Sequence, residues 1–471
     1  MKHLCIAAAL LLAPATAHAA GAPKAAKPNI LVIVADDLGY GDIGVHGGKA
    51  VPTPNIDKLA AAGVRCTSGY VSAPYCSPSR AGLLTGRYQT HFGHEFNPHV
   101  GPEGTLGLPL DQRTIADLLR TAGYATGLVG KWHLGFDKQH HPQSRGFDDF
   151  FGFLVGGHNY TLRKDAEPKF ASAMSQNLIY RGREVQKVDG FATDVFTDEA
   201  IGFMKRHKDQ PWFLYLAYNA VHTPLEISDR VKDRIPPEVK DQARRGYLAL
   251  LLGLDDGIGR IRDHLKQTGA DENTIIFFIS DNGGSGQPGF LAYNTGINRP
   301  LRGNKGQTLE GGIRVPFVIA WPGKLPAGKT YPHPVIALDI LPTACALAGI
   351  KTPANVDGVH LLPHLLGKTQ APPHEALYWR FGPQKAVRKG NWALVDWRDF
   401  EKKTSSGWQL FDLSQDIGQQ KDVAALNPAV VAELSEAWQR WNAKNTAPLW
   451  HGSPTEDPTA PKAPPKKNAK K

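Results

Sequence analysis

A cysteine and an arginine lie four residues apart in the segment Cys76-Ser77-Pro78-Ser79-Arg80. The proline between them restricts the backbone of this segment. This spacing sets a possible precursor of a nucleophile beside a guanidinium. In isolation, the segment fits equally well a buried cysteine that acts as a small hydrophobe, with the arginine in a surface ion pair. The choice between these two interpretations depends on what else the chain carries.

Four oxygen donors follow two apolar runs that have the composition of buried strands. Asp36 and Asp37 follow one run, and Asp281 and Asn282 follow the other. In open α/β sheets, the carboxyl ends of parallel strands build the functional sites. Each pair alone is also a common turn sequence. Together they form an oxygen-only ligand set, which selects calcium or magnesium over zinc.

Two lysines and two histidines complete the candidate chemistry. Lys131 and His133 stand two residues apart just after an expected strand, so both side chains point to one face if the chain stays extended. His222 follows another expected strand, and Lys305 lies in the glycine-rich segment 301–316. A lone Lys-x-His is usually a surface pair, so these residues gain meaning only in combination.

In combination, the segments resemble the signatures of the sulfatase family, the formylglycine-dependent, arylsulfatase-type members of the alkaline phosphatase-like superfamily. The resemblance spans about residues 28–442. The segments that carry it are C-x-P-S-R at 76–80, Leu83-Leu84-Thr85-Gly86-Arg87, 123–135, Phe150-Phe151-Gly152, 219–225 and 301–316.

The resemblance implies a nucleophile made after translation. In that family, the cysteine of C-x-P-S-R is oxidised to formylglycine, so Cys76 is expected to be converted by a formylglycine-generating enzyme. One hydroxyl of the hydrated aldehyde attacks sulfur and displaces the alcohol, and the other then expels sulfate by re-forming the aldehyde. An unmodified thiol has no comparable release step.

The resemblance also implies the metal and its ligands. Calcium, with magnesium as the alternative, is expected to polarise a sulfate oxygen and to stabilise the deprotonated nucleophile as a Lewis acid. The expected metal ligands are Asp36, Asp37, Cys76, Asp281 and Asn282.

The remaining candidates take catalytic roles by resemblance. Arg80 is expected to neutralise the hydrate or its sulfated adduct, helped by the N-terminus of a helix that begins in the same segment. Lys131 and Lys305 are expected to bind the sulfate. His133 should hydrogen-bond the hydrate and later act as a base that helps to expel sulfate, while His222 contacts the sulfate and protonates the departing alcohol.

Three further features near these motifs have expected roles. Glu310 and Arg314 should hold their loop through a structural ion pair. His158 and Asn159 either line the pocket or only satisfy the hydrogen bonds of a loop. The histidine-rich insert 91–98 is expected to reach the pocket rim.

Apolar strands and helices alternate along the first part of the chain. This alternation predicts an α/β fold with a large, mainly parallel sheet sandwiched by helices. The expected strands are 29–35, 125–129, 213–217 and 274–280, and the expected helices include about 55–62 and 114–122.

The pattern changes after about residue 350. Short aromatic or β-branched pieces between 377 and 413 predict a small antiparallel sheet. A helix capped by Asn427, with Pro428 at its first position, carries Trp438 and Trp441 at helical spacing. These tryptophans could bind sugar, but the spacing favours packing against the small sheet.

The N-terminus has the pattern of a secretory signal, with Lys2, an apolar core at 4–12 and Ala17-His18-Ala19 at the cleavage positions. We therefore expect export to the periplasm or secretion. The expected division of the chain is a signal peptide at 1–19, a linker at 20–28, a catalytic domain at 29–350, a C-terminal subdomain at 351–445 and a disordered Pro/Lys-rich tail at 446–471.

Export would place the cysteines in an oxidising compartment. If Cys76 is consumed by oxidation, Cys66 and Cys345 could pair. Each lies in an apolar context, which favours two separate buried thiols.

The formal net charge of this 471-residue chain is +10, and part of the excess lies in the C-terminal tail. The mildly basic remainder suits anionic substrates such as sulfated glycans, and no nucleic-acid-binding module is recognisable. No internal apolar run approaches the roughly 20 residues needed to cross a bilayer. The composition therefore favours neither a nucleic-acid partner nor an integral membrane protein.

The prediction is a sulfatase that hydrolyses O-sulfate monoesters of sulfated carbohydrates, with an arylsulfatase side activity. The alternative enzyme is a phosphonate or phosphate ester hydrolase of the same superfamily, although Lys131, His133 and Lys305 together favour a sulfate monoester. A third hypothesis is a sulfoglycan-binding protein in which Cys76 is never modified.

Overall fold

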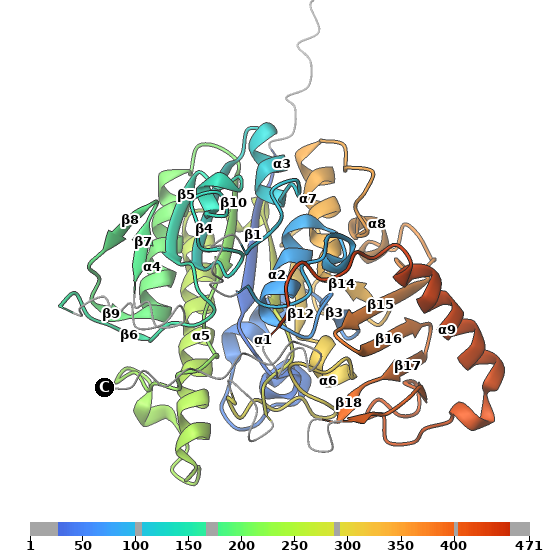
Figure 1. Ribbon diagram of the computed structural model, residues 1–471. Coiled ribbons are helices and arrows are strands. Elements are labelled where there is room, and N and C mark those ends of the chain that lie inside the picture. The colour runs from blue at the N-terminus through green and yellow to red at the C-terminus, as the bar shows by residue number, and fades with distance from the viewer. Residues whose placement is uncertain (1–26, 99–105, 166–177, 287–292, 400–403, 453–471) are drawn as a thin grey trace, which may run out of the picture.

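The computed structural model describes residues 27–98, 106–165, 178–286, 293–399 and 404–452. A ten-stranded sheet runs through the larger part of the molecule, and a smaller sheet with one long helix lies beside it (Figure 1). The expected signal peptide, most of the linker and most of the tail lie outside the described residues.

Strand β1 (Asn29–Ala35) lies inside the large sheet, between two parallel neighbours. It pairs with β10 (Trp212–Ala217) and with β11 (Thr274–Ser280), and β10 pairs in parallel with β4 (Ala125–Lys131). All seven residues of β1 are buried because both faces of the sheet are covered. The predicted α/β fold with a mainly parallel sheet is confirmed.

The outer strands of this sheet are partly antiparallel. The full order is β13-β2-β12-β11-β1-β10-β4-β5-β7-β8, in which β12 is antiparallel to both β11 and β2, and β7 is antiparallel to both β5 and β8. The bounds of these strands are β2 Gly63–Cys66, β5 Asp149–Phe153, β7 Ile179–Arg181, β8 Glu184–Gln186, β12 Phe317–Ala320 and β13 Lys329–Tyr331.

Helices cover both faces of the sheet, and alternate residues of β1 point to different layers. Leu31 and Ile33 belong to the core under α1, α4 and α5, whereas Ile30 and Val32 belong to the core under α2, α3 and α7. The expected helices 55–62 and 114–122 are α1 and α3, each within one residue. The helix bounds are α1 Pro54–Ala61, α2 Cys76–Thr85, α3 Ile115–Thr121, α4 Ala192–Arg206, α5 Gln242–Gln267, α6 Glu310–Ile313, α7 Ile340–Ala348 and α8 Leu362–Leu365.

The predicted small sheet is also present, as four antiparallel strands in the order β15-β16-β17-β20 (Figure 1). Helix α9 (Pro428–Asn442) packs on it. The strand bounds are β15 Ala376–Phe381, β16 Gln384–Lys389, β17 Trp392–Asp396 and β20 Gln409–Asp412. Shorter strands are β3 Gly69–Tyr70, β6 Thr161–Leu162, β9 Gly190–Phe191, β14 Val335–Ile336, β18 Arg398–Asp399 and β19 Thr404–Ser405.

The tryptophans of α9 pack as the sequence predicts. Trp438 and Trp441 are buried in the core between α9 and the small sheet, and Trp438 Nε1 donates to the carbonyl oxygen of Trp379 at 2.9 Å. Asn427 is the N-cap residue of α9 and Pro428 is its first residue, as predicted. The side chain of Asn427 makes no capping hydrogen bond, and its amide instead donates to the carbonyl oxygen of Val423 at 2.9 Å.

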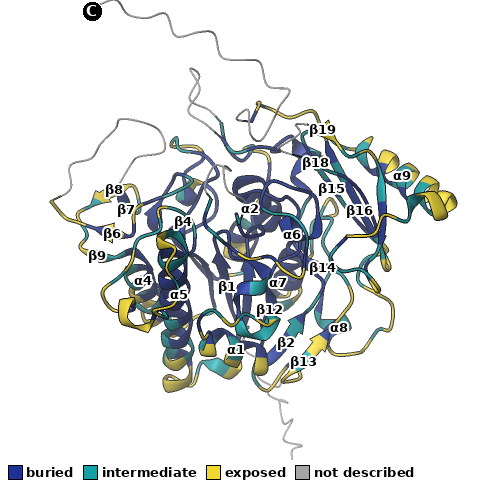
Figure 2. Cartoon of the chain, turned by 90° about the horizontal axis from the view of Figure 1, so that it is seen from below, coloured by how far each residue is buried: buried dark blue, intermediate teal, exposed yellow. Residues whose placement is uncertain are grey.

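After α9 the chain returns to the part that is built on the large sheet, as a segment that we call the C-terminal strap, residues 443–452. Its backbone is hydrogen-bonded to residues 90 and 93, at the start of the insert. Thr446 N donates to the carbonyl oxygen of Thr90, and Leu449 N donates to the carbonyl oxygen of Gly93, each at 2.9 Å. Burial concentrates around α2 and β1 at the centre of the molecule (Figure 2). The strap therefore ties the last described residues to the region next to α2.

Cys66 and Cys345 are buried and unpaired, which confirms the prediction of two separate thiols. Among the helices of the described ranges, none combines the length and the apolar character needed to span a bilayer.

Candidate active site

The register of β1 and β11 brings the predicted metal ligands together. Ala35 pairs with Ser280, so the acidic residues that follow each strand lie at the same end of the sheet. Carboxylate oxygens of Asp36, Asp37 and Asp281 lie within 4.8 Å of one another, and all three residues are buried. Lone carboxylates are expensive to bury, so this cluster needs cations.

Asn282 adjoins the cluster, and two acceptors there are unsatisfied. Asn282 Nδ2 donates to Asp37 Oδ1 at 2.7 Å, which leaves Asn282 Oδ1 facing no donor. Asp36 Oδ1 is likewise buried without a hydrogen-bond partner. Buried oxygens are normally paired, and a hard divalent cation would satisfy both. The residues present therefore fit calcium or magnesium.

Cys76 is the first residue of α2 and lies beside this cluster. Its Sγ is 3.9 Å from Asp37 Oδ1, and ligand atoms of Cys76, Asp36 and His222 lie within 4.8 Å of one another. Burial raises the pKa of the Cys76 thiol to about 12. As a thiol, the residue stays protonated at neutral pH and is a poor nucleophile.

Three basic side chains neutralise the three carboxylates. Arg80 binds Asp281 Oδ2 through Nε at 3.0 Å and Nη2 at 2.7 Å. The other two pairs are Lys131 Nζ with Asp36 Oδ2 at 2.6 Å and Lys305 Nζ with Asp37 Oδ1 at 2.7 Å. Because the charges balance, a bound divalent cation would make the centre positive and suited to an anionic ester.

The buried charges shift the pKa values of the carboxyl groups in opposite directions. Burial raises the pKa of Asp281, and the neighbouring charge of Asp36 adds to this effect. Burial would raise the pKa of Asp36 as well, but Lys131, His222 and Arg80 together lower it below its usual value. Asp36 is therefore the more firmly ionised of the two carboxyl groups.

His133 lies at the site, but not in the predicted way. Its φ of 61° is left-handed, so the chain turns after β4. The expected extended stretch that would point Lys131 and His133 to one face is wrong. Burial, followed by the charge of Lys131, lowers the pKa of His133 well below its usual value, so the ring is neutral at pH 7.

His222 Nε2 lies 3.7 Å from Asp37 Oδ2, and its Nδ1 donates to the carbonyl oxygen of Thr223 at 2.7 Å. Burial lowers the pKa of His222, although Asp36 and Asp37 oppose this shift. The structure thus brings together every predicted site residue, from six different stretches of the chain.

The sequence also predicted roles for three features next to these residues. The ion pair between Glu310 and Arg314 is present at 3.1 Å, as predicted. His158 satisfies a loop, since its Nδ1 donates to the carbonyl oxygen of Asn159 at 2.7 Å. In the insert 91–98, Phe92, His94, Glu95 and Phe96 are buried, and the C-terminal strap and the small sheet contact this segment. That the insert reaches the pocket rim stays a prediction.

Two contacts of the site were not predicted. Ser77 is only the variable position of C-x-P-S-R in the sequence. Its backbone N donates to Asn97 Oδ1 at 3.0 Å, and its Oγ shares a hydrogen bond with His94 Nε2 at 2.7 Å. The insert carries several polar residues at similar spacing, so no sequence signal separates the ones that face Ser77 from their neighbours.

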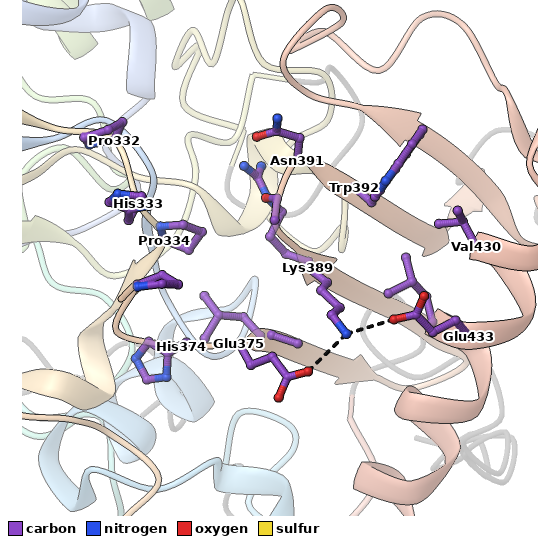
Figure 3. A pocket seen from close by; sticks show the side chains of 16 residues that line it. Pro332, His333, Pro334, His374, Glu375, Lys389, Asn391, Trp392, Val430 and Glu433 are labelled. Atoms are coloured by element: carbon purple, nitrogen blue, oxygen red, sulfur yellow. Dashed lines mark hydrogen bonds and ion pairs between the residues drawn. The ribbon is translucent and has the colours of Figure 1, made fainter. Parts of the chain in front are cut away.

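A cavity of about 780 Å³ lies elsewhere, between Pro332–Pro334 and the small sheet (Figure 3). None of the candidate catalytic residues lines it. Its Lys389 is held by Glu375 at 3.0 Å and Glu433 at 2.8 Å, so this ammonium group is neutralised and does not attract a sulfate.

Residues 28–350 match the family model described as Sulfatase, and residues 304–442 match the one described as N-sulphoglucosamine sulphohydrolase, C-terminal. Among curated proteins, dog N-acetylgalactosamine-6-sulfatase is 35% identical over 404 residues, covering 82% of this chain and 75% of the relative. Bovine arylsulfatase A is 36% identical over 405 residues, covering 80% and 76%.

Among solved structures, Ps i-CgsB in complex with k-i-k-neocarrahexaose superposes with a TM-score of 0.82 at 37% identity, covering 90% of this chain and 94% of that chain. The family model, the relatives and the fold agree with the cluster of carboxylates, cations and Cys76 described above. The chain belongs to the sulfatase family and is a sulfuric ester hydrolase.

Proposed function

We propose that this sulfatase removes O-sulfate groups from sulfated carbohydrates and accepts aryl sulfates as a side activity. The observation that carries the proposal is the buried centre in which Cys76 adjoins three carboxylates and three cations. The choice of a carbohydrate is supported by relatives named for an N-acetylgalactosamine sulfate and by the solved structure that holds a neocarrahexaose.

Two groups complete the proposed site. Asp36, Asp37, Asp281 and Asn282, with residue 76, would hold calcium, or magnesium as the alternative, and the ion would polarise the sulfate as a Lewis acid. Cys76, converted to formylglycine by a modifying enzyme, would supply the hydroxyl that displaces the alcohol at sulfur.

The lysines and Arg80 bind and orient the anion in this proposal. Lys131 and Lys305 pair with Asp36 and Asp37, which would also hold the cation, so both ammonium groups would be placed to bind the sulfate oxygens. Arg80 stays on Asp281 and keeps positive charge next to residue 76.

The histidines move protons. His133 is neutral at pH 7, so it can accept the proton that is released when sulfate leaves. His222 is proposed to protonate the departing alcohol oxygen, with its orientation fixed by the hydrogen bond from Nδ1 to Thr223.

The N-terminal pattern at 1–19 supports export, and we propose a periplasmic or secreted location for the mature chain. We also propose that the catalytic domain covers 29–350 and that 351–445 forms the C-terminal subdomain. The partners are the sulfated substrate and the formylglycine-generating enzyme.

The test starts from protein made in its own host. The mass of the tryptic peptide that ends at Arg80 reports the fraction of Cys76 converted to the aldehyde. The converted protein and the C76A variant are then compared on sulfated oligosaccharides, 4-nitrophenyl sulfate and 4-nitrophenyl phosphate. We expect sulfate release from an oligosaccharide and from the aryl sulfate, with little phosphate release and no turnover by C76A.

Other outcomes would contradict parts of the proposal. Turnover of the aryl sulfate alone would remove the carbohydrate assignment. Faster release of phosphate than of sulfate would favour the ester hydrolase alternative. A free thiol throughout, with tight glycan binding and no turnover, would instead indicate a binding protein.

A further inference from the structure

Ser77, the residue after Cys76, is held by three hydrogen bonds from outside helix α2. Its Oγ lies 2.6 Å from the carbonyl oxygen of His133 and 2.7 Å from His94 Nε2, and its backbone N donates to Asn97 Oδ1 at 3.0 Å. Ser77 and His94 have no exposed surface, and His133 is buried as well. These contacts join the nucleophile helix to the loop that carries His133.

The proton positions in this arrangement follow from the acceptors. The carbonyl oxygen of His133 can only accept, so the single hydroxyl proton of Ser77 is donated to it. The contact with His94 must then be an N–H donated from Nε2 to the Ser77 oxygen. Burial lowers the pKa of His94 to about 3, although a hydrogen bond to the backbone of Gly107 opposes this shift, so the ring is neutral. His94 thereby orients the hydroxyl of Ser77 toward His133.

The backbone of His133 needs such support. Its φ of 61° is a left-handed conformation, which is unfavourable for a residue with a Cβ and persists only where the surroundings fix it. The N–H of His133 donates to the Leu154 oxygen at 3.1 Å, and its carbonyl is held by Ser77. Ser77 is thus one of two backbone anchors that set where the His133 ring lies.

The C-terminal strap contacts His94 and Asn97, the two insert residues that bind Ser77. The ring of Trp450 meets the His94 ring edge-on, with 4.7 Å between centroids, and Trp450 Nε1 donates to the carbonyl oxygen of Asn97 at 3.0 Å. Both partners of Ser77 in the insert are therefore fixed from outside. These contacts connect Trp450 to His133 through His94 and Ser77.

We propose that His94 and Ser77 are positioning residues for His133, acting through its backbone carbonyl oxygen. The inference rests on the proposed role of His133 as the base. Loss of either side chain lets the loop at 133 relax and moves the ring away from residue 76. The step that needs the ring then slows, while the sulfate contacts of Lys131 and Lys305 remain.

The decisive variant is S77A, which removes one oxygen atom and preserves the C-x-P-S-R pattern. Turnover of 4-nitrophenyl sulfate is normalised to the fraction of Cys76 converted, measured by mass. We expect kcat to fall on the order of 10- to 100-fold with KM changed by less than about threefold, since misplacing a catalytic group affects the reaction more than binding.

Three variants of the insert separate positioning from general damage. H94F keeps a ring but has no donor, so it should behave as S77A. H94Q offers an amide N–H in place of Nε2–H and should recover most of the lost kcat. H91F is the matched control, because His91 lies three residues earlier and pairs with Asp357 at 3.1 Å, away from Ser77. It should keep wild-type kcat.

A crystal structure of S77A gives a reading that does not depend on turnover. A shift of the His133 ring, with Lys131 and Asp36 unmoved, supports the proposal. An unmoved ring, or a kcat within about twofold of wild type at equal conversion, overturns it. If converted wild-type protein releases no sulfate, the proposed function fails, whereas the positions in the S77A structure still decide the inference.

Discussion

Lys131 Nζ and Asp36 Oδ2 lie 2.6 Å apart, and neither side chain has any exposed surface. Lys131 ends β4 and Asp36 follows β1, with β10 between these two strands. Neighbouring strands lie about 4.8 Å apart, so the lysine has to reach over the end of one strand to meet the carboxylate. A buried ion pair of this kind costs desolvation of both groups, and its place at the candidate site points to chemistry more than to stability.

Replacing Lys131 should therefore lower the catalytic activity. For K131A we expect kcat/KM on 4-nitrophenyl sulfate to fall by on the order of 100-fold or more, because a sulfate contact is lost. The metal-free protein should also lose about 3–5 kcal/mol in urea unfolding, because Asp36 is left buried without its partner. Lys266, an exposed residue of α5, provides the control variant K266A. Wild-type kcat/KM in K131A would exclude a sulfate contact by Lys131.

Removal of divalent ions tests the unsatisfied oxygens of Asp36 and Asn282. Treatment with a chelator should abolish sulfate release, and calcium should restore it better than magnesium. At a calcium concentration about 100 times its Kd, binding to the native state adds about 2.7 kcal/mol, so the Tm should rise. The D37N variant should show no such rise. Full activity in the presence of chelator would remove the metal from the proposal.

The ion pair of Glu310 and Arg314 supports a stability prediction. Glu310 also accepts from the Tyr70 hydroxyl at 2.9 Å, and all three residues are buried. In E310A the guanidinium of Arg314 loses its partner, so the free energy of unfolding should fall by about 3–5 kcal/mol.

Urea unfolding of converted protein measures this loss. The exposed pair of Lys232 and Asp229 gives a control, because K232A removes a contact that water screens and should change stability by no measurable amount. Equal stability of E310A and wild type would contradict the expected loss.

His374 should make stability depend on pH. Burial lowers its pKa, but the charge and hydrogen bond of Asp339, 2.8 Å away, outweigh burial and raise the pKa above its usual value. A raised pKa in the folded state contributes stability that is fully present below the unfolded value, near 6.5, and is lost as pH rises through the folded value.

The Tm difference between wild type and H374Q should therefore be larger at about pH 5.5 than at about pH 8.5. Using the difference cancels the titration of groups that both proteins share. An equal difference at the two pH values would show that the charged form of His374 adds nothing.

The buried strands and their acidic ends were predictable because they depend on local composition. The continuous apolar runs of β1 and β11 identify central strands, and the carboxylates that follow them must then meet at one sheet end. The pairing of Glu310 with Arg314 and the separate thiols of Cys66 and Cys345 were predictable for the same reason.

Features set by distant contacts were not predictable. β12 is antiparallel to β11, although its apolar residues resemble those of a parallel strand, since composition does not encode direction. The left-handed turn at His133 depends on the Ser77 hydroxyl and the Leu154 carbonyl, which are far away in sequence. The side chain of Asn427 could cap α9, but its amide instead donates to the carbonyl oxygen of Val423.

The place of β1 also constrains how the chain can fold. β1 is the first strand to be synthesised, yet one of its neighbours, β11, lies about 245 residues further on. Until residue 280 has emerged, this strand, which is apolar from Ile30 to Ala35, lacks a partner on one side, and its free edge can pair with other chains. Such a high contact order predicts slow folding and a nascent chain that needs protection from aggregation until about three fifths of it exists.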